Sequence, residues 1–172
     1  MKRFGAFLAV AAILAPVVAF AAAGPLSLEA NAAYLANYAK QPGVIVRPSG
    51  LMYKIVHNGY GRRPKPTDVV TVFYTGALIT GTVFDGTEAS LPAQFKPNQL
   101  IQGWTEALIN MREGDQWHIV IPANLAYGAR GAGGGTIPPN QALVFDVTLV
   151  TVTTPKEKPE DPNDEHEGSG AE

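Results

Sequence analysis

The chain has 172 residues but no cysteine, and few of its side chains are charged. Without cysteine there is no disulfide, no thiol nucleophile and no zinc–thiolate site. Charged residues make up 16% of the chain and the formal net charge is -2, whereas a nucleic-acid-binding protein carries a basic stripe. These shortages exclude thiol chemistry and argue against nucleic acid as a partner.

Residues that carry hydrolytic or metal chemistry are also scarce. The three histidines, His57, His118 and His166, are scattered, and we expect His118 on the solvated face of a strand. The chain has no nucleophile elbow and no paired carboxylates of the kind that glycosidases use. The acidic run 161–165 lacks the glycine and the terminal glutamate of a calcium loop. The sequence therefore predicts neither a metal site nor a cofactor.

A glycine run at 131–135 is the one feature that resembles a phosphate-binding loop. Such a loop is followed by a helix and usually carries a lysine. Here the next residues are Thr136, Ile137 and two prolines, which cannot begin that helix. We interpret the run as a turned loop.

The first residues have the pattern of a secretory signal peptide. Lys2 and Arg3 precede an uncharged apolar run over 4–20, and small residues at 19, 21 and 23 form cleavage signals. A retained membrane anchor is the alternative, but the run is marginal for spanning a bilayer. We predict a cleaved signal peptide at 1–23, export to the periplasm or full secretion, and no membrane attachment of the mature chain.

The segments at either side of the central region differ from it in composition. Residues 24–44 predict a short helical extension, with Ser27 as cap and Leu28, Ala32, Leu35 and Ala39 at helical spacing. We expect this helix to be loosely docked; a dimerisation helix would be longer, so a monomer is predicted rather than a dimer. Residues 154–172 have no aromatic or branched apolar residue and predict a disordered acidic tail.

Residues 45–153 predict one α+β domain. Alternating apolar residues indicate strands at 51–56, 69–78, 116–121 and 143–152, with a short strand around Phe84. The segment 101–111 predicts the one helix of the domain, with Trp104, Leu108 and Met111 on one stripe. An antiparallel sheet packed on this helix is the arrangement that such a pattern favours.

Several segments of this domain, in order along the chain, resemble those of the FKBP family of immunophilins, and in particular of the short exported bacterial proteins related to macrophage infectivity potentiators. They are Ser49-Gly50-Leu51-Met52-Tyr53, Val72-Phe73-Tyr74-Thr75-Gly76, Val83-Phe84-Asp85, Leu100-Ile101-Gln102-Gly103-Trp104, Leu125-Ala126-Tyr127-Gly128, Ile137-Pro138-Pro139 and Leu143-Val144-Phe145-Asp146. The resemblance implies an FKBP-like half-barrel, in which a curved antiparallel sheet wraps around one short helix.

The resemblance also implies a site. Trp104 would form the floor of an apolar pocket, and the loop above it would contribute Tyr127 and Ile137. The Ile101 N–H and the Tyr127 hydroxyl would bond substrate carbonyls, and Asp85 would lie beside the twisting amide. The walls would be formed by Tyr74, Phe84, Leu100, Ile101 and Phe145.

Two departures from the family pattern concern the rim of that pocket. Many members carry a further pocket aromatic before the helix, but here Ala93 falls near that place and we expect Phe95 to serve the sheet. The loop at 130–136 lacks the aromatic or histidine that is common there.

The activity implied is peptidyl-prolyl cis–trans isomerisation, which would accelerate the folding of exported, proline-containing polypeptides. Macrolide inhibitors are possible further ligands. Two alternatives remain open: a module that grips proline-containing chains without turnover, and an envelope interaction protein that uses its acidic tail.

Overall fold

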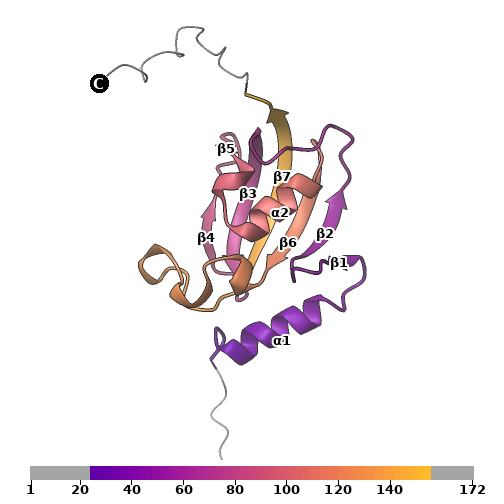
Figure 1. The fold of residues 1–172 in the computed structure, drawn as a ribbon. Helices are drawn as coiled ribbons and strands as arrows, with labels where there is room; N and C mark the ends of the chain where they lie inside the picture. Colours follow the sequence, from indigo (N-terminus) through magenta and orange to yellow (C-terminus); the bar gives the residue numbers. More distant parts are fainter. Residues whose placement is uncertain (1–23, 156–172) are drawn as a thin grey trace, which may run out of the picture.

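The computed structural model describes residues 24–155 and shows one antiparallel sheet with one helix across its face and the other along its lower end (Figure 1). The predicted signal peptide, and residues 156–172 of the predicted tail, lie outside the described residues. The helices are α1 (Leu28–Tyr38) and α2 (Gln102–Asn110), and the strands are β1 (Val44–Val46), β2 (Met52–His57), β3 (Val69–Leu78), β4 (Val83–Gly86), β5 (Ala93–Phe95), β6 (Gln116–Ile121) and β7 (Leu143–Thr153). The α+β prediction is confirmed.

The strand order places the last strand in the middle of the sheet. The order is β1-β2-β6-β7-β3-β4, and β5 pairs with β3 beside this path. Strand β7 pairs with β3 over its whole length, from Val69 opposite Thr153 to Leu78 opposite Leu143, and with β6 on its other side. Distant segments of the chain therefore build the centre of the domain.

Helix α2 packs on one face of the sheet and closes the main core. Its predicted stripe is confirmed, because Trp104 is 5% exposed and Leu108 and Met111 are fully buried. The facing strand β6 contributes Trp117 and Ile119, which are also buried. Burying one such large apolar side chain contributes about 1.5–3 kcal/mol, so this layer holds α2 firmly against the sheet.

Helix α1 packs on the opposite face, at the lower end of the molecule in Figure 1, and this differs from the sequence prediction of a loosely docked helix. Tyr38 is 4% exposed and packs with Met52 and Val120. Leu28, which the predicted stripe placed inward, is 62% exposed, whereas Asn31 is 4% exposed. The buried stripe is therefore rotated from the predicted one.

His118 lies beneath this helix, where the sequence predicted a solvated face. Its Nδ1 is 2.7 Å from Oδ1 of Asp146, and its ring lies 5.6 Å from that of Tyr38. The predicted alternation along β6 agrees with the structure, but α1 partly covers the outward face of the strand. Among residues 24–155, neither helix has both the length and the apolar character needed to cross a membrane.

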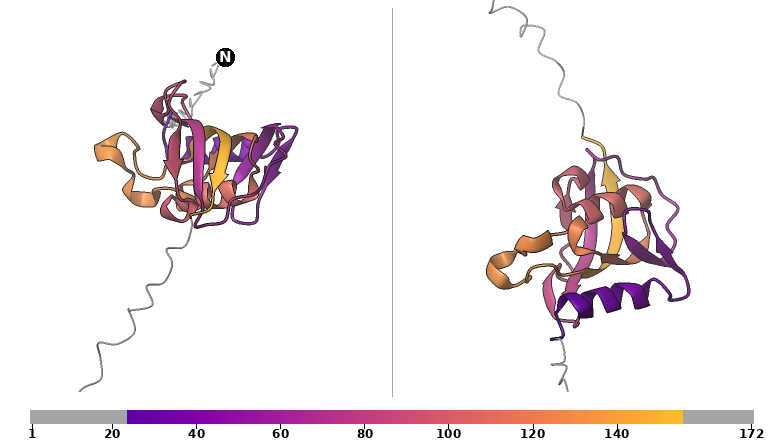
Figure 2. Two further views of the ribbon diagram at one scale, coloured as in Figure 1. Left: turned by 90° about the horizontal axis from the view of Figure 1, so that it is seen from above. Right: turned by 60° about the horizontal axis from the view of Figure 1, so that its bottom comes forward.

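Between β6 and β7 the chain forms a long loop with three 3₁₀ turns, at Ala123–Leu125, Gly128–Arg130 and Gly133–Gly135. Figure 2 shows this orange loop projecting from the body of the domain. The loop is closed on itself, because Ala132 and Ile137 exchange backbone hydrogen bonds of 2.9 and 3.1 Å. This loop carries Tyr127, which lines the same cavity as Ile101 at the start of α2.

Candidate functional site

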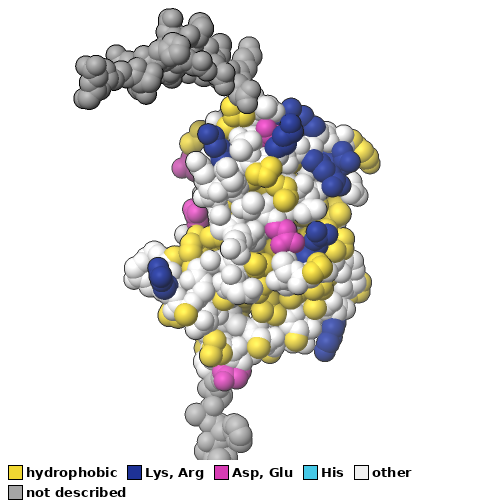
Figure 3. Space-filling model, viewed as in Figure 1, with side chains coloured by type: hydrophobic (Ala, Val, Ile, Leu, Met, Phe, Trp, Pro, Cys, Tyr) yellow, Lys and Arg dark blue, Asp and Glu magenta, His cyan; other side chains and the backbone are white. Residues whose placement is uncertain are grey.

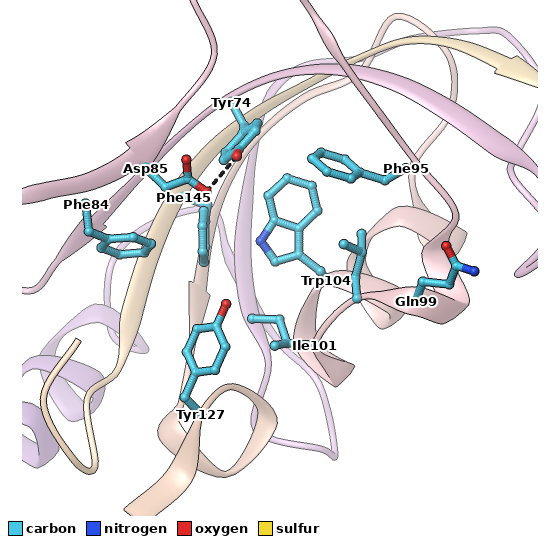
Figure 4. Close-up of a pocket in the computed structure, with 10 residues that line it drawn as sticks. Tyr74, Phe84, Asp85, Phe95, Gln99, Ile101, Trp104, Tyr127 and Phe145 are labelled. Carbon is cyan, nitrogen blue, oxygen red and sulfur yellow. Dashed lines mark hydrogen bonds between the residues drawn. The ribbon is translucent and has the colours of Figure 1, made fainter. Parts of the chain in front are cut away.

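An apolar cavity of about 300 Å³ lies between α2, the neighbouring strands and the projecting loop. Figure 4 shows its side chains converging from β3, β4, β5, β7, the start of α2 and the loop. Its lining consists of Tyr74, Phe84, Asp85, Phe95, Gln99, Leu100, Ile101, Trp104, Tyr127 and Phe145. All but one of the nine residues proposed from the sequence therefore meet in one hollow.

Trp104 forms the floor, because α2 begins just before it and turns the indole toward the sheet. The ring meets those of Tyr74 and Phe145 edge to face, with centroids 5.2 and 5.3 Å apart. Such T-shaped pairs stabilise each other beyond their buried area. The floor is thus a rigid aromatic surface.

Phe84 and Phe145 form one wall, and the glycine at 76 makes room for them. Their ring centroids are 5.7 Å apart and their planes are perpendicular. A Cβ at Gly76 would lie 2.6 Å from Phe145 and 2.9 Å from Phe84, closer than real carbon contacts allow. The same residue stands next to a register shift between β3 and β4. The absence of a side chain at 76 therefore sets this wall.

A carboxylate and a phenol provide the polar side of the cavity. The Tyr74 hydroxyl donates a 2.7 Å hydrogen bond to Oδ2 of Asp85, and Asp85 Oδ1 accepts from the Gly86 amide at 2.9 Å. Burial, followed by the bond to Asp85 and its negative charge, raises the pKa of Tyr74 above its ordinary value. Tyr74 is therefore a neutral donor that fixes the carboxylate.

Ile101 and Tyr127 stand at the opposite side, where hydrogen-bonding groups face the hollow. Ile101 is the N-cap of α2, and N–H groups at a helix start have no intrahelical partner. Tyr127 is 41% exposed and its hydroxyl points toward the middle of the cavity (Figure 4). Both groups are placed to reach a bound chain.

The prediction for Ile137 does not agree with the structure. Ile137 is 6% exposed and belongs to the main core, and it does not line the cavity. Its backbone pairing with Ala132 turns the residue inward. Ile137 therefore anchors the loop from beneath.

Two lining residues, Phe95 and Gln99, were not among the predicted site residues. Phe95 was expected to serve the sheet, and it does pair with Val70, but its ring also meets Trp104 with centroids 6.1 Å apart. The signal that was missed is register, since the pairing of β5 with β3 turns Phe95 to the same side as Tyr74. Gln99 ends the 3₁₀ turn Pro97–Gln99, and no pattern in the sequence indicates its side chain.

A second and larger cavity, of about 580 Å³, lies around the loop after β2 and is polar. It contains Asp115, whose carboxylate accepts hydrogen bonds from the amides of Gly59 and Arg112. Those groups close the loop at this place, so we assign them a structural role. No group of acidic, histidine or cysteine side chains suited to a metal ion occurs within residues 24–155.

Hydrophobic side chains reach the surface over the middle and lower part of the face in Figure 3, and Lys and Arg side chains gather at its upper right. The apolar cavity itself has no Lys or Arg in its lining, and Asp85 is the one carboxylate there. A ligand for it would be selected by shape and apolar contact rather than by charge.

Comparison with known proteins gives two family matches. The model described as FKBP-type peptidyl-prolyl cis-trans isomerase matches residues 61–150. The model described as the domain amino terminal to FKBP-type peptidyl-prolyl isomerase matches residues 19–55. The second match includes α1, so this helix has counterparts in other proteins.

Curated relatives are longer than this chain. "Outer membrane protein MIP" of Legionella longbeachae is 51% identical over 121 residues, which cover 70% of this chain and 52% of the relative. The "FKBP-type 22 kDa peptidyl-prolyl cis-trans isomerase" of Escherichia coli is 48% identical over 120 residues, which cover 69% and 58%. The matched part thus spans a little more than half of each relative's length.

Solved structures have the same fold. A peptidyl-prolyl cis-trans isomerase of Pseudomonas syringae superposes with a TM-score of 0.69 at 37% identity, covering 74% of this chain and 93% of that one. FkpA of Escherichia coli superposes with a TM-score of 0.68 at 43% identity, covering 72% and 57%. Together with the match over residues 61–150, these likenesses show that the chain belongs to the FKBP-type peptidyl-prolyl cis–trans isomerase family.

Proposed function

We propose that this protein is a peptidyl-prolyl cis–trans isomerase that acts on proline-containing polypeptides. The observation that carries the proposal is the 300 Å³ aromatic cavity, whose lining has one carboxylate and no serine, cysteine, histidine or lysine. The lining therefore has none of the commonest nucleophiles of covalent catalysis, and both oxygens of its one carboxylate already accept hydrogen bonds, from the Tyr74 hydroxyl and the Gly86 amide. It suits a reaction in which no bond to the substrate is made or broken.

Rotation about an X-Pro bond is such a reaction. Amide resonance sets a barrier of roughly 18–20 kcal/mol, and uncatalysed isomerisation takes tens of seconds or more. The twisted transition state has lost resonance and carries less charge separation than the planar amide. A dry apolar cavity therefore favours the twisted form over the planar one, which is catalysis by differential binding. Each tenfold acceleration requires only about 1.4 kcal/mol.

In this mechanism the proline ring would rest on Trp104 between the aromatic walls. The Ile101 N–H and the Tyr127 hydroxyl would hold carbonyls at each side of the rotating bond, which limits the bound chain to the geometry of the twist. Asp85, held by Tyr74 at 2.7 Å, would provide the polar group beside the amide.

A proline-peptide assay on the purified protein tests the proposal. We expect the wild-type protein to isomerise the peptide faster than buffer alone. Asp85→Val should be slower than the wild type, although its domain stays folded. A wild-type rate equal to buffer would remove the enzyme claim, and stoichiometric suppression of client aggregation would then favour a binding module. Macrolides are proposed as competitive ligands, so adding one in the same assay should reduce the rate.

We further propose that the protein is exported and that cleavage near residue 23 leaves a mature chain of three parts: the helical segment 24–44, the catalytic domain 45–153 and the acidic tail 154–172. One relative is named an outer membrane protein, which supports an envelope location. N-terminal sequencing of the protein from the periplasm and the medium tests this; an intact Met1 start would contradict it.

The mature chain is proposed to be a monomer. Helix α1 has 11 residues, and its buried side chains already face the sheet of the same chain. Sedimentation analysis should give one species of the chain's own mass, and a concentration-dependent dimer would overturn this.

A further inference from the structure

Two buried amide side chains join α1 to the root of the loop that carries Tyr127. Asn31, in the second turn of α1, and Gln141, just before β7, are both 4% exposed. The Asn31 Nδ2 group donates to Oε1 of Gln141 at 3.0 Å. The two residues are 110 positions apart in the chain, so this contact exists only in the folded protein.

Each amide is satisfied on both of its ends. Oδ1 of Asn31 accepts from the Ala142 amide at 2.8 Å, and its Nδ2 also donates to the Ser27 carbonyl at 2.9 Å. Gln141 donates through Nε2 to the carbonyls of Leu26 and Pro139, at 3.0 and 2.9 Å. A buried polar network that is fully paired is rigid and specifies one arrangement. We call this set, Leu26, Ser27, Asn31, Pro139, Gln141 and Ala142, the amide latch.

The amide latch is one residue away from the bond that closes the loop. The Asn140 amide donates to the Gly128 carbonyl at 2.8 Å, and Asn140 has a positive φ of 61°, a turn conformation that asparagine tolerates better than most non-glycine residues. Gly128 directly follows Tyr127. The path from α1 to the Tyr127 backbone thus consists of two hydrogen bonds and two covalent steps.

The C-terminal part of α1 makes different contacts. Leu35 and Tyr38 pack against Met52 and Val120 on the sheet and make none of the latch hydrogen bonds. Docking of the helix on the sheet and its contact with the loop are therefore made by different residues. This separation provides a control that loosens the helix without touching the loop directly.

We propose that Asn31 and Gln141 are positioning residues, through which α1 fixes the loop that presents Tyr127 to a bound chain. The catalytic part of this inference rests on the proposed isomerase function, whereas the structural part does not.

The test compares Asn31→Ala with Leu35→Ala in the full chain, and the melting temperature of each variant is measured alongside. We expect Asn31→Ala to accelerate hydrogen exchange at the Asn140 amide and to lower kcat/KM by about 3- to 10-fold, chiefly through KM, as expected for losing one or two buried hydrogen bonds. Leu35→Ala should leave both within about twofold. Gln141→Met, which keeps the length but lacks the amide, should reproduce the effect.

Each outcome either supports or overturns the proposed role of the two amides. The effects of Asn31→Ala and Gln141→Met on kcat/KM and on exchange should not be additive in the double variant, because both substitutions break one network. Unchanged exchange at Asn140 in folded Asn31→Ala would overturn the latch, and equal effects of Leu35→Ala would reduce Asn31 to a structural role. If Asn31→Ala does not fold, Gln141→Met decides alone. If the wild type does not isomerise, the proposed function fails, and the exchange data still judge the latch.

Discussion

The hydroxyl of Tyr74 and the carboxylate of Asp85 are joined by a 2.7 Å hydrogen bond at the rim of the aromatic cavity. The two residues lie on the paired strands β3 and β4. Because Tyr74 also meets Trp104 edge to face, one side chain connects the polar rim with the floor. The carboxylate therefore has a fixed direction before any ligand arrives.

Removing that hydroxyl should lower the isomerase activity while leaving the aromatic lining of the cavity in place. In Tyr74→Phe the ring contacts remain but Asp85 is released, so we expect kcat/KM for a proline peptide to fall by about 3- to 10-fold. The measurement is a coupled or NMR-exchange isomerase assay. As a control, Tyr53→Phe lies outside the cavity in a stack with Trp117 and should leave the rate as it is; an unaltered rate in Tyr74→Phe would contradict the role of the bond.

A methyl group at 76 should disturb the wall. Gly76→Ala would force Phe84 and Phe145 apart, and overpacking of this kind costs about 1–3 kcal/mol. We expect a lower melting temperature and a lower kcat/KM together. Gly24→Ala, which meets nothing within 4 Å, serves as the control. Full activity with wild-type stability in Gly76→Ala would show that the wall does not depend on this glycine.

The two tryptophans should respond differently to a ligand. Trp104 forms the floor of the cavity, whereas Trp117 is stacked on Tyr53 with centroids 4.1 Å apart and does not line it. A bound proline peptide should therefore change Trp104 emission only. The change should survive in Trp117→Phe and vanish in Trp104→Phe, and the reverse result would place binding elsewhere.

Alkaline solution should destabilise the fold. Burial, followed by the negative charges of ionised Tyr34 and of Asp146, raises the pKa of Tyr38 from 10.0 to about 12. Between these values the Tyr38 hydroxyl is ionised in the unfolded state but still protonated in the folded state. The contribution of Tyr38 to the free energy of unfolding is therefore fully present below pH 10.0 and is lost as the pH rises through about 12. Chemical unfolding at several pH values measures this slope.

Tyr38→Phe should flatten that slope, since phenylalanine has no proton to lose. The control is Tyr60→Phe, because Tyr60 is 91% exposed and its removal should leave the slope unchanged. A slope that is the same in wild type and Tyr38→Phe would assign the alkaline loss to other groups.

The sequence predicted those helices and strands in which the apolar residues repeat at one spacing over many positions. Strand β3 was located to the residue, because its apolar side chains alternate over ten positions. Strands β1 and β5 were missed, since three residues cannot show a period and each is defined by its partner strand. Phe95 was assigned to the sheet alone for the same reason.

The rotated stripe of α1 has a different cause. Apolar spacing suggested Leu28 as a buried position, but the structure buries Asn31 instead, in an amide pair with Gln141. Hydrophobic pattern carries no information about a hydrogen-bond partner 110 residues away. The prediction for Ile137 was wrong because the sequence shows only that this residue lies in the loop. Its backbone pairing with Ala132, which turns the side chain toward the core, cannot be inferred from the sequence.

The central place of β7 has a consequence for synthesis. Residues 143–153 separate β6 from β3, so the two halves of the sheet have no common partner until nearly the whole domain has left the ribosome. Pairings between such distant segments form slowly. A chain with this topology can complete its sheet only after residues 143–153 have been synthesised, so the main core closes late in translation.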